Sequence, residues 1–224
     1  MERESVTDPS PAAIKQALAQ HSCVDDFELP GRIRDVPAAT MVPLRWQSEL
    51  MAIATVRTAG LRLHGGEVCF PGGTPDSPDE NLQRTALREA HEELGIESAQ
   101  VLGRLSRMPV YTSNHRITPW VTAIDDTVLR PQPEEVAHVL EIPLHALLRQ
   151  PALEGLPFPL NDGHAWSPLF DLNGHIMFGA TAHTLLELLT VLAPLYGLEV
   201  PPMKRGKTRW ADILPPELVA EAEA

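Results

Sequence analysis

The sequence has few cysteines and no long apolar run. Cys23 and Cys69 are the only cysteines among 224 residues, so no disulfide framework is predicted. No uninterrupted apolar run approaches the roughly 20 residues that a membrane-spanning helix needs. Three of the first four residues are charged, which is unlike a secretory signal. Together these absences predict a cytoplasmic protein that makes no contact with a membrane.

Basic residues are scarce relative to acidic ones. The chain has 18 lysines and arginines against 30 aspartates and glutamates, which gives a formal net charge of −12 at pH 7. Proteins that bind nucleic acids usually present a basic face that releases counterions from the phosphates. We therefore expect no nucleic-acid partner. A small phosphoanhydride remains compatible, because bound cations and a few local arginines can offset its charge.

The order of apolar and turn residues predicts one α/β sandwich. Strands are expected over residues 39–46, 51–58, 67–70, 99–107, 116–125 and 136–142, with a hairpin over 167–178. Helices are expected over residues 11–20, 78–94, 144–148 and 181–195, and the apolar character of the last indicates either deep packing or a homodimer contact. We expect an N-terminal extension over 1–36, the main domain over 37–199, and a poorly ordered tail over 200–224.

The helix predicted over residues 78–94 has clear signals at both ends. Ser77, Pro78 and Glu80 form a capping-box pattern, with serine as N-cap, proline at the first helical position and glutamate at the third. Gly95 suits the left-handed conformation that ends a helix. The helix therefore has a predicted start, a predicted end and a fixed register of side chains between them.

Three carboxylates gather on one face of this helix. At about 100° per residue, Glu89, Glu92 and Glu93 lie opposite an apolar stripe. They repel one another, and they oppose the dipole at the C-terminal end of the helix. A bound cation would reverse both effects, and Mg²⁺ and Mn²⁺ prefer oxygen ligands. The carbonyl of Gly72, in the glycine turn before the helix, can add a ligand; the alternative is a solvated acidic face.

The complete pattern resembles the Nudix box of the Nudix hydrolases, with a spacer one residue longer than usual. The matching residues are Gly73, Glu80, Arg88-Glu89-Ala90, Glu92-Glu93 and Gly95-Ile96. The longer spacer is usual in the coenzyme A pyrophosphatase branch, and residues upstream of the box resemble the extra motif of that branch. These residues are Arg57-Thr58, Arg62, Gly66 and Phe70-Pro71-Gly72-Gly73, followed by Asp76 and Asp79. Ile53-Ala54 and Thr58 depart from the commoner residues of the branch motif.

The resemblance implies a fold, a cofactor and a set of metal ligands. The implied fold is a Nudix-type α/β/α sandwich with a mixed β-sheet, and the implied cofactor is Mg²⁺ or Mn²⁺. Glu89, Glu92 and Glu93 are the implied ligands, with the Gly72 carbonyl and Glu80 as further candidates. For Glu80 the capping box is a complete alternative explanation.

The resemblance also implies catalytic residues around the metal site. The base in such enzymes is a glutamate of the box or an acid from a later loop, where Glu134 and Glu135 are the options, with a solvated loop as their alternative. Of these acids, Glu93 or Glu135 is expected to be the general base. We expect Arg88 to orient a carboxylate, with Glu92 one turn along the helix as its natural partner. The alternative for Arg88 is an exposed helix ion pair that contributes little to stability.

Candidate substrate-binding residues lie around the glycine turn. Arg57, Arg62 and His64 precede the turn, and cationic side chains suit phosphate oxygens. Arg116 belongs to a segment that is expected to form one lip of the pocket. The favoured substrate is coenzyme A or an acyl derivative, cleaved to 3′,5′-ADP and a 4′-phosphopantetheine product. The alternatives are NADH, ADP-ribose or another nucleoside diphosphate derivative, and a catalytically silent nucleotide sensor, which the complete set of acids disfavours.

Overall fold

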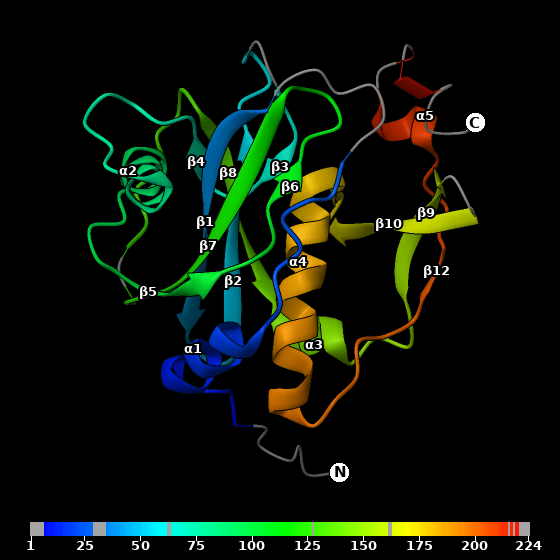
Figure 1. Cartoon of the computed structure of the whole chain (residues 1–224), viewed down its shortest axis with the longest axis horizontal. Coiled ribbons are helices and arrows are strands. Elements are labelled where there is room, and N and C mark those ends of the chain that lie inside the picture. The colour runs from blue at the N-terminus through cyan, green and yellow to red at the C-terminus, as the bar shows by residue number, and fades with distance from the viewer. Residues whose placement is uncertain are drawn as a thin grey trace.

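The chain is described by a computed structural model over residues 7–28, 35–61, 64–126, 128–160, 163–214, 216, 218 and 219. A mixed sheet lies at its centre (Figure 1). The main path of this sheet is β3 (Val68–Cys69), β2 (Leu50–Arg57), β1 (Val36–Trp46), β7 (His115–Ile124) and β5 (Ala99–Arg104). Strands β1 and β7 are parallel, whereas β2 pairs antiparallel with β1 and β5 pairs antiparallel with β7. Three further strands join β1, β7 and β2 respectively, namely β4 (Gly72–Gly73), β6 (Met108–Pro109) and β8 (Val136–Pro143).

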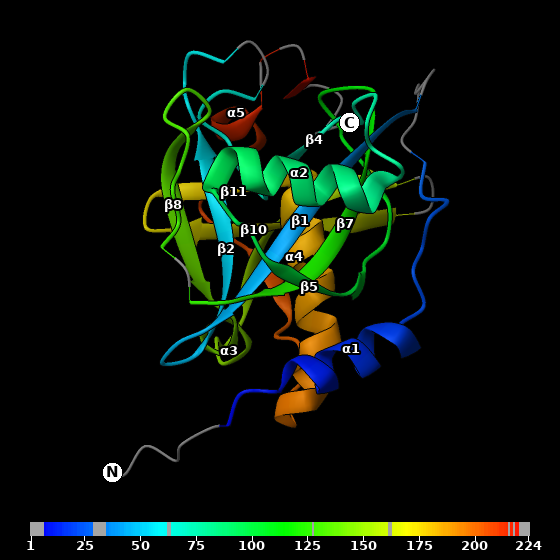
Figure 2. The same ribbon diagram turned by 90° about the vertical axis from the view of Figure 1, so that its left-hand side faces the viewer.

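Helices cover both faces of this sheet (Figure 2). Helix α2 (Leu82–Leu94) packs on one face, where Met41 and Ile53 belong to the same apolar cluster as its buried residues. Helix α4 (Gly179–Leu192) lies on the other face, with α1 (Pro11–Gln20) and α3 (Leu144–Leu148). Val42 joins the cluster on the α4 side, because neighbouring strand residues point to opposite faces. The predicted α/β/α sandwich with a mixed sheet is confirmed.

Helix α4 is buried between the central sheet and a second sheet. Its Leu185, Leu188 and Leu189 side chains have no exposed surface. Deep packing therefore explains its apolar character, and the predicted homodimer stays a prediction. A short 3₁₀ helix, η1 (Ala193–Tyr196), continues from its end. None of the helices within the described residues combines the length and the apolar character needed to cross a membrane.

The second sheet contains two strands that the sequence pattern did not predict. Its order is β11 (His175–Met177), β10 (Gly163–Leu172), β9 (Leu153–Leu160) and β12 (Met203–Arg205). The unpredicted strands are β9 and β12, and in β9 the residues Pro157 and Pro159 obscure the pattern, because proline is uncommon inside strands. The predicted hairpin between β10 and β11 is confirmed, with Asn173 and Gly174 in left-handed conformations at its turn.

The segment after residue 200 is part of the fold in its described portion. Strand β12 pairs in parallel with β9, and α5 (Trp210–Ile213) packs on the same sheet. The Trp210 indole N–H donates to the Pro157 carbonyl at 3.1 Å, and 7% of the residue is exposed. The expectation of poor order is therefore wrong for residues 203–214, because apolar burial of Trp210 fixes them. At the other end, α1 packs on α4 and β5. The division at residues 36 and 199 stays a prediction.

The predicted start of the helix over residues 78–94 is wrong. Helix α2 begins at Leu82, and its N-cap is Asn81, whose side chain accepts a hydrogen bond from the Arg84 backbone N–H at 3.0 Å. The preceding residues form a turn in which the Asp79 carboxylate accepts from the backbone N–H of Asp76. A second N-cap residue closer to the helix thus replaces the capping box. The predicted end is confirmed, since Gly95 is left-handed with a φ of 69°.

The position of the N-cap gives a direct test. We expect Asn81→Ala to lower the free energy of unfolding by about 1 kcal/mol, because one N-terminal backbone N–H loses its acceptor. Ser77→Ala is the matched control and should leave that free energy within about 0.5 kcal/mol of the wild-type value. Urea unfolding followed by circular dichroism measures both. An effect of Ser77→Ala as large as that of Asn81→Ala would restore the capping box as the start of the helix.

Candidate active site

A cavity of about 530 Å³ lies beside the glycine turn, between the central sheet and the second sheet. Gly72 and Gly73 line it, together with Arg57 and His64 from the predicted substrate-binding set. Much of the remaining wall is aromatic, with Tyr111, Phe158, Trp166, Phe178 and Trp210 contributing. The cavity therefore combines a small polar edge at the glycine turn with an extended apolar wall.

Glycine is required at the turn because the chain is crowded there. Gly73 pairs with Ala39 of β1, and Gly72 pairs with Thr40. A Cβ atom on Gly72 would lie 2.7 Å from the Cα atom of Thr40. A Cβ atom on Gly73 would lie 2.7 Å from the carboxylate carbon of Glu89. The two glycines thus let α2 place its acids directly over the turn.

Glu93 lies in the least exposed position of the three helix acids. Only 2% of its side chain is exposed, and its Oε1 atom accepts from the Gly72 backbone N–H at 3.4 Å. The same oxygen lies 3.8 Å from an Arg57 guanidinium nitrogen. Burial raises the pKa of Glu93 to about 7. Its Oε2 atom is buried and has no hydrogen-bond partner among the described residues.

Arg88 connects the acids of α2 to the turn before the helix. Its guanidinium donates to Glu92 Oε2 at 2.9 Å and to the Thr74 carbonyl at 3.0 Å, and it forms an ion pair with Glu89 at 3.0 Å. It also donates to the Asp79 carboxylate at 3.0 to 3.2 Å, which lowers the pKa of Asp79 to about 2. The contact with Glu92 agrees with the expected pairing. The contact with Asp79 was not predicted. The one signal for it was that Asp79 is among the residues that resemble the branch motif.

The two remaining acids of the predicted set differ in position. The Glu135 carboxylate is close enough to Glu89 and Glu93 to raise the pKa of both, although burial is the larger cause in each case. Thr58 N–H donates to the Glu135 carbonyl at 2.9 Å, which fixes the loop that carries it. Glu80 is exposed and precedes α2. The catalytic role of Glu135 and the ligand role of Glu80 both stay predictions.

Arg116 occupies a buried position away from the cavity lining. Its guanidinium is 2% exposed and donates to Asp35 and to Glu28, both at 2.7 Å. It also donates to the backbone carbonyls of Asp25 and Phe27. These contacts favour a structural role for Arg116, which holds residues 25–28 and Asp35 against β7, over the predicted contact with substrate. The reason is that its donors are already committed to the protein.

Of the other two predicted binding residues, His64 is among the described residues and Arg62 is not. His64 lines the cavity, and its Nδ1 atom lies 3.0 Å from the Glu67 carboxylate. Arg62 lies outside the described residues. The aromatic wall was not predicted at all, because its residues come from segments far apart in the sequence. Trp210 in the supposed tail was the one signal available, since aromatic residues are scarce in disordered segments.

The acids of α2 fit a divalent cation by their chemistry. Glu89, Glu92 and Glu93 offer only carboxylate oxygens, the donor type that Mg²⁺ and Mn²⁺ prefer. The Glu93 Oε2 atom, buried without a partner among the described residues, is an oxygen that a cation would satisfy. The three side chains do not place their oxygens within 4.8 Å of one another in the described part of the chain. Glu92 is instead paired with Arg88.

The chain is similar in sequence to several bacterial proteins that share one description. Three are called "Uncharacterized Nudix hydrolase NudL". The protein from Yersinia enterocolitica is 40% identical over 115 residues, which are 50% of this chain and 58% of that protein. The protein from Pectobacterium atrosepticum is 40% identical over 125 residues, covering 53% and 65%. The protein from Photorhabdus laumondii is 33% identical over 155 residues, covering 67% and 82%. The chain thus spans less than two thirds of the length of the first two relatives.

The chain also resembles solved structures of Nudix proteins, and it matches the model of one protein family. A NUDIX hydrolase from Alicyclobacillus acidocaldarius aligns with 18% identity and a TM-score of 0.44, over 76% of this chain and all of that chain. The NUDIX domain of Shewanella oneidensis NrtR, solved with ADP ribose, aligns with 17% identity and a TM-score of 0.42, over 56% and 83%. The model of the NUDIX domain matches residues 36–159, more than half of the 224 residues. The protein therefore belongs to the Nudix family.

Proposed function

We propose that this protein is a Nudix pyrophosphohydrolase that cleaves the diphosphate linkage of coenzyme A or an acyl derivative. The observation that carries the proposal is the meeting of two motifs at the glycine turn, which lines one side of the cavity. Arg57 and the Gly72-Gly73 turn, which match the branch motif, line the cavity together with His64, and the turn lies beneath the α2 acids of the Nudix box. Residues for binding phosphate and residues for holding a cation are thus adjacent.

The proposed reaction is the attack of water on one phosphorus atom of the diphosphate. When bound at Glu89, Glu92 and Glu93, Mg²⁺ or Mn²⁺ would supply an activated water and neutralise charge on the phosphoryl oxygens. A carboxylate, Glu93 or Glu135, accepts a proton from the water. The bond from phosphorus to the bridging oxygen breaks, and that oxygen leaves with the other phosphate. The Arg57 guanidinium, beside Glu93, is placed to orient a phosphate oxygen.

Arg88 acts in this proposal as a positioning residue. It holds Glu89 and Glu92 through separate guanidinium nitrogens and is itself anchored by Asp79 and the Thr74 carbonyl. A planar guanidinium with several donors can hold carboxylates in fixed orientations, which a lysine cannot do in the same way. The acids are therefore oriented by the turn that precedes their own helix.

The cavity wall supports a substrate with large apolar or aromatic parts. Aromatic side chains such as Phe158, Trp166 and Trp210 suit an adenine ring or the pantetheine arm, whereas the diphosphate matches the polar edge at Arg57. The branch motif favours coenzyme A within this class. NADH and ADP-ribose also carry adenine and a diphosphate, so they are the rivals within the same reaction.

Product analysis separates these substrates. Purified protein with Mg²⁺ or Mn²⁺ is incubated separately with coenzyme A, NADH and ADP-ribose, and the products are identified by mass spectrometry. We expect 3′,5′-ADP and 4′-phosphopantetheine from coenzyme A as the fastest reaction. Glu92→Gln should lower its rate by about 100-fold or more, because a metal ligand is lost. Preferential cleavage of NADH or ADP-ribose would reject the coenzyme A assignment, and tight binding without any turnover would favour the sensor.

Matched amide variants test both candidates for the general base. We expect either Glu93→Gln or Glu135→Gln to lower kcat by about 100-fold or more, because the amide cannot accept the proton from water. Glu134→Gln is the control, since Glu134 is exposed and adjacent in sequence to Glu135. Steady-state kinetics with coenzyme A measure all three variants. If Glu93→Gln and Glu135→Gln both keep a kcat near that of wild type, neither residue is the base.

A further inference from the structure

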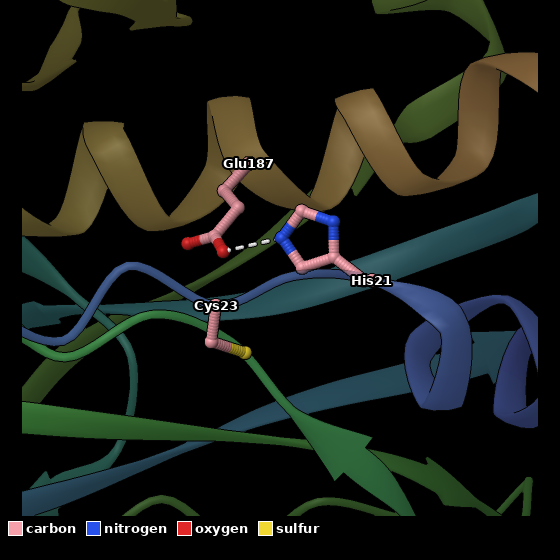
Figure 3. Close-up of side chains that lie close together, drawn as sticks. All are labelled: His21, Cys23 and Glu187. Carbon is pink, nitrogen blue, oxygen red and sulfur yellow. Dashed lines mark hydrogen bonds and ion pairs between the residues drawn. The ribbon is translucent and has the colours of Figure 1, made fainter.

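A second group of metal-ligating side chains lies on the far side of the central sheet from α2. It consists of His21 at the end of α1, Cys23 in the segment that follows, and Glu187 on α4 (Figure 3). One ligand atom from each of the three residues lies within 4.8 Å of the other two. No other group of this kind occurs among the described residues. Imidazole, thiolate and carboxylate together are the donor types found on protein-bound Zn²⁺.

The Glu187 carboxylate is held in place by Ser106. Its Oε1 atom accepts from the Ser106 hydroxyl at 2.6 Å and from His21 Nε2 at 2.7 Å. Its Oε2 atom accepts from the Ser106 backbone N–H at 3.1 Å, a donor that it shares with Oε1. Residues next to a metal site typically orient the ligands by hydrogen bonds of this type. The shared bond leaves Oε2 with capacity for a further contact.

The charges around the group also suit a divalent cation. The Arg104 guanidinium, which acts electrostatically on Cys23, forms a two-point ion pair with Asp25, at 2.8 and 2.7 Å. Burial raises the pKa of the Cys23 thiol, which donates to the Arg104 carbonyl at 3.7 Å. One thiolate and one carboxylate would balance the two charges of Zn²⁺.

We propose that His21, Cys23 and Glu187 form a Zn²⁺ site, separate from the catalytic acids, that clamps the segment after α1 onto α4. Binding releases the proton of the Cys23 thiol, and the proton that His21 Nε2 donates to Glu187 moves to Nδ1. His21 binds through Nε2 as the neutral tautomer that carries its proton on Nδ1. The direct bond between His21 and Glu187 is replaced by bonds from both residues to the ion.

The clamp would act on a segment that reaches the cavity. A few residues after Cys23 the chain contributes Phe27 to the cavity lining, and Arg116 holds the carbonyl of Phe27 at 2.9 Å. The hydrogen bond between His21 and Glu187 already tethers this segment without a metal. That hydrogen bond does not explain why the Cys23 thiol lies close to both His21 and Glu187. Cys23 follows His21 by two residues in the sequence.

Cobalt spectroscopy tests the proposal on the full chain. Chelator-treated protein is titrated with Co²⁺, and the near-ultraviolet band that arises from thiolate-to-cobalt charge transfer is recorded. We expect this band to saturate at one ion per chain and to disappear when Zn²⁺ is added. The catalytic acids offer only oxygen and give no such band. Cys23→Ser should abolish the band, whereas Cys69→Ser, the matched control at the other cysteine, should retain it. Absence of the band in the wild-type protein would overturn the proposal.

A measurement on the wild-type chain keeps the test independent of any folding defect in the variants. The protein is alkylated with iodoacetamide with and without Zn²⁺, and the two cysteine peptides are quantified by mass spectrometry. We expect Zn²⁺ to slow the alkylation of Cys23 by about tenfold or more, because a metal-bound thiolate is a poor nucleophile. Cys69 serves as the internal reference and should react at an unchanged rate. Equal alkylation of Cys23 under both conditions would contradict the zinc site.

Discussion

The close contact between the glycine turn and α2 is the constraint on which the candidate site depends. Gly73 has no side chain, and the Glu89 carboxylate occupies the space that a Cβ atom would need. The backbone of Gly72 donates to Glu93, whose other oxygen is buried without a partner among the described residues. Burial that would be unfavourable for an isolated carboxylate is consistent with a site that gains a cation. The strand pairing fixes the position of this contact, because β1 pairs with the glycine turn.

The two halves of the candidate site come from different parts of the chain. The turn and the acids lie within residues 36–159, the part that matches the family model. Much of the aromatic cavity wall lies beyond it, in Trp166, Phe178 and Trp210. We therefore expect the reaction chemistry to depend on the shared part, and the choice of substrate to depend on the second sheet and α5. The segment before β1 adds Phe27 to the same wall, held by the ion pairs of Arg116.

Local signals in the sequence predicted the elements but not the contacts between distant segments. The left-handed Gly95 and the Asn173-Gly174 turn were predicted because each depends on its own residues and their neighbours. The start of α2 was predicted too early, because the sequence offers two N-cap residues there, Ser77 and Asn81. The structure uses Asn81, and the Arg88–Asp79 ion pair forms across the turn that precedes it. Strand β9 was missed because its pairing with β10 and β12 outweighs its prolines. The burial of Arg116 depends on a segment about 90 residues earlier, as its contact with Phe27 illustrates, which no local pattern reveals.

The affinity for Mn²⁺ reports whether the glycine turn positions the acids of α2 for a cation. Gly73→Ala places a methyl group where the Glu89 carboxylate lies, whereas a Cβ atom at Gly60 would meet no other atom within 4 Å. Isothermal titration calorimetry of both variants and the wild-type protein gives the Kd for Mn²⁺. We expect Gly73→Ala to weaken Mn²⁺ binding by about tenfold or more, since displaced ligands lose affinity, and Gly60→Ala to leave it unchanged. Equal affinity in all three proteins would contradict the claim that the glycine turn positions the acids for a cation.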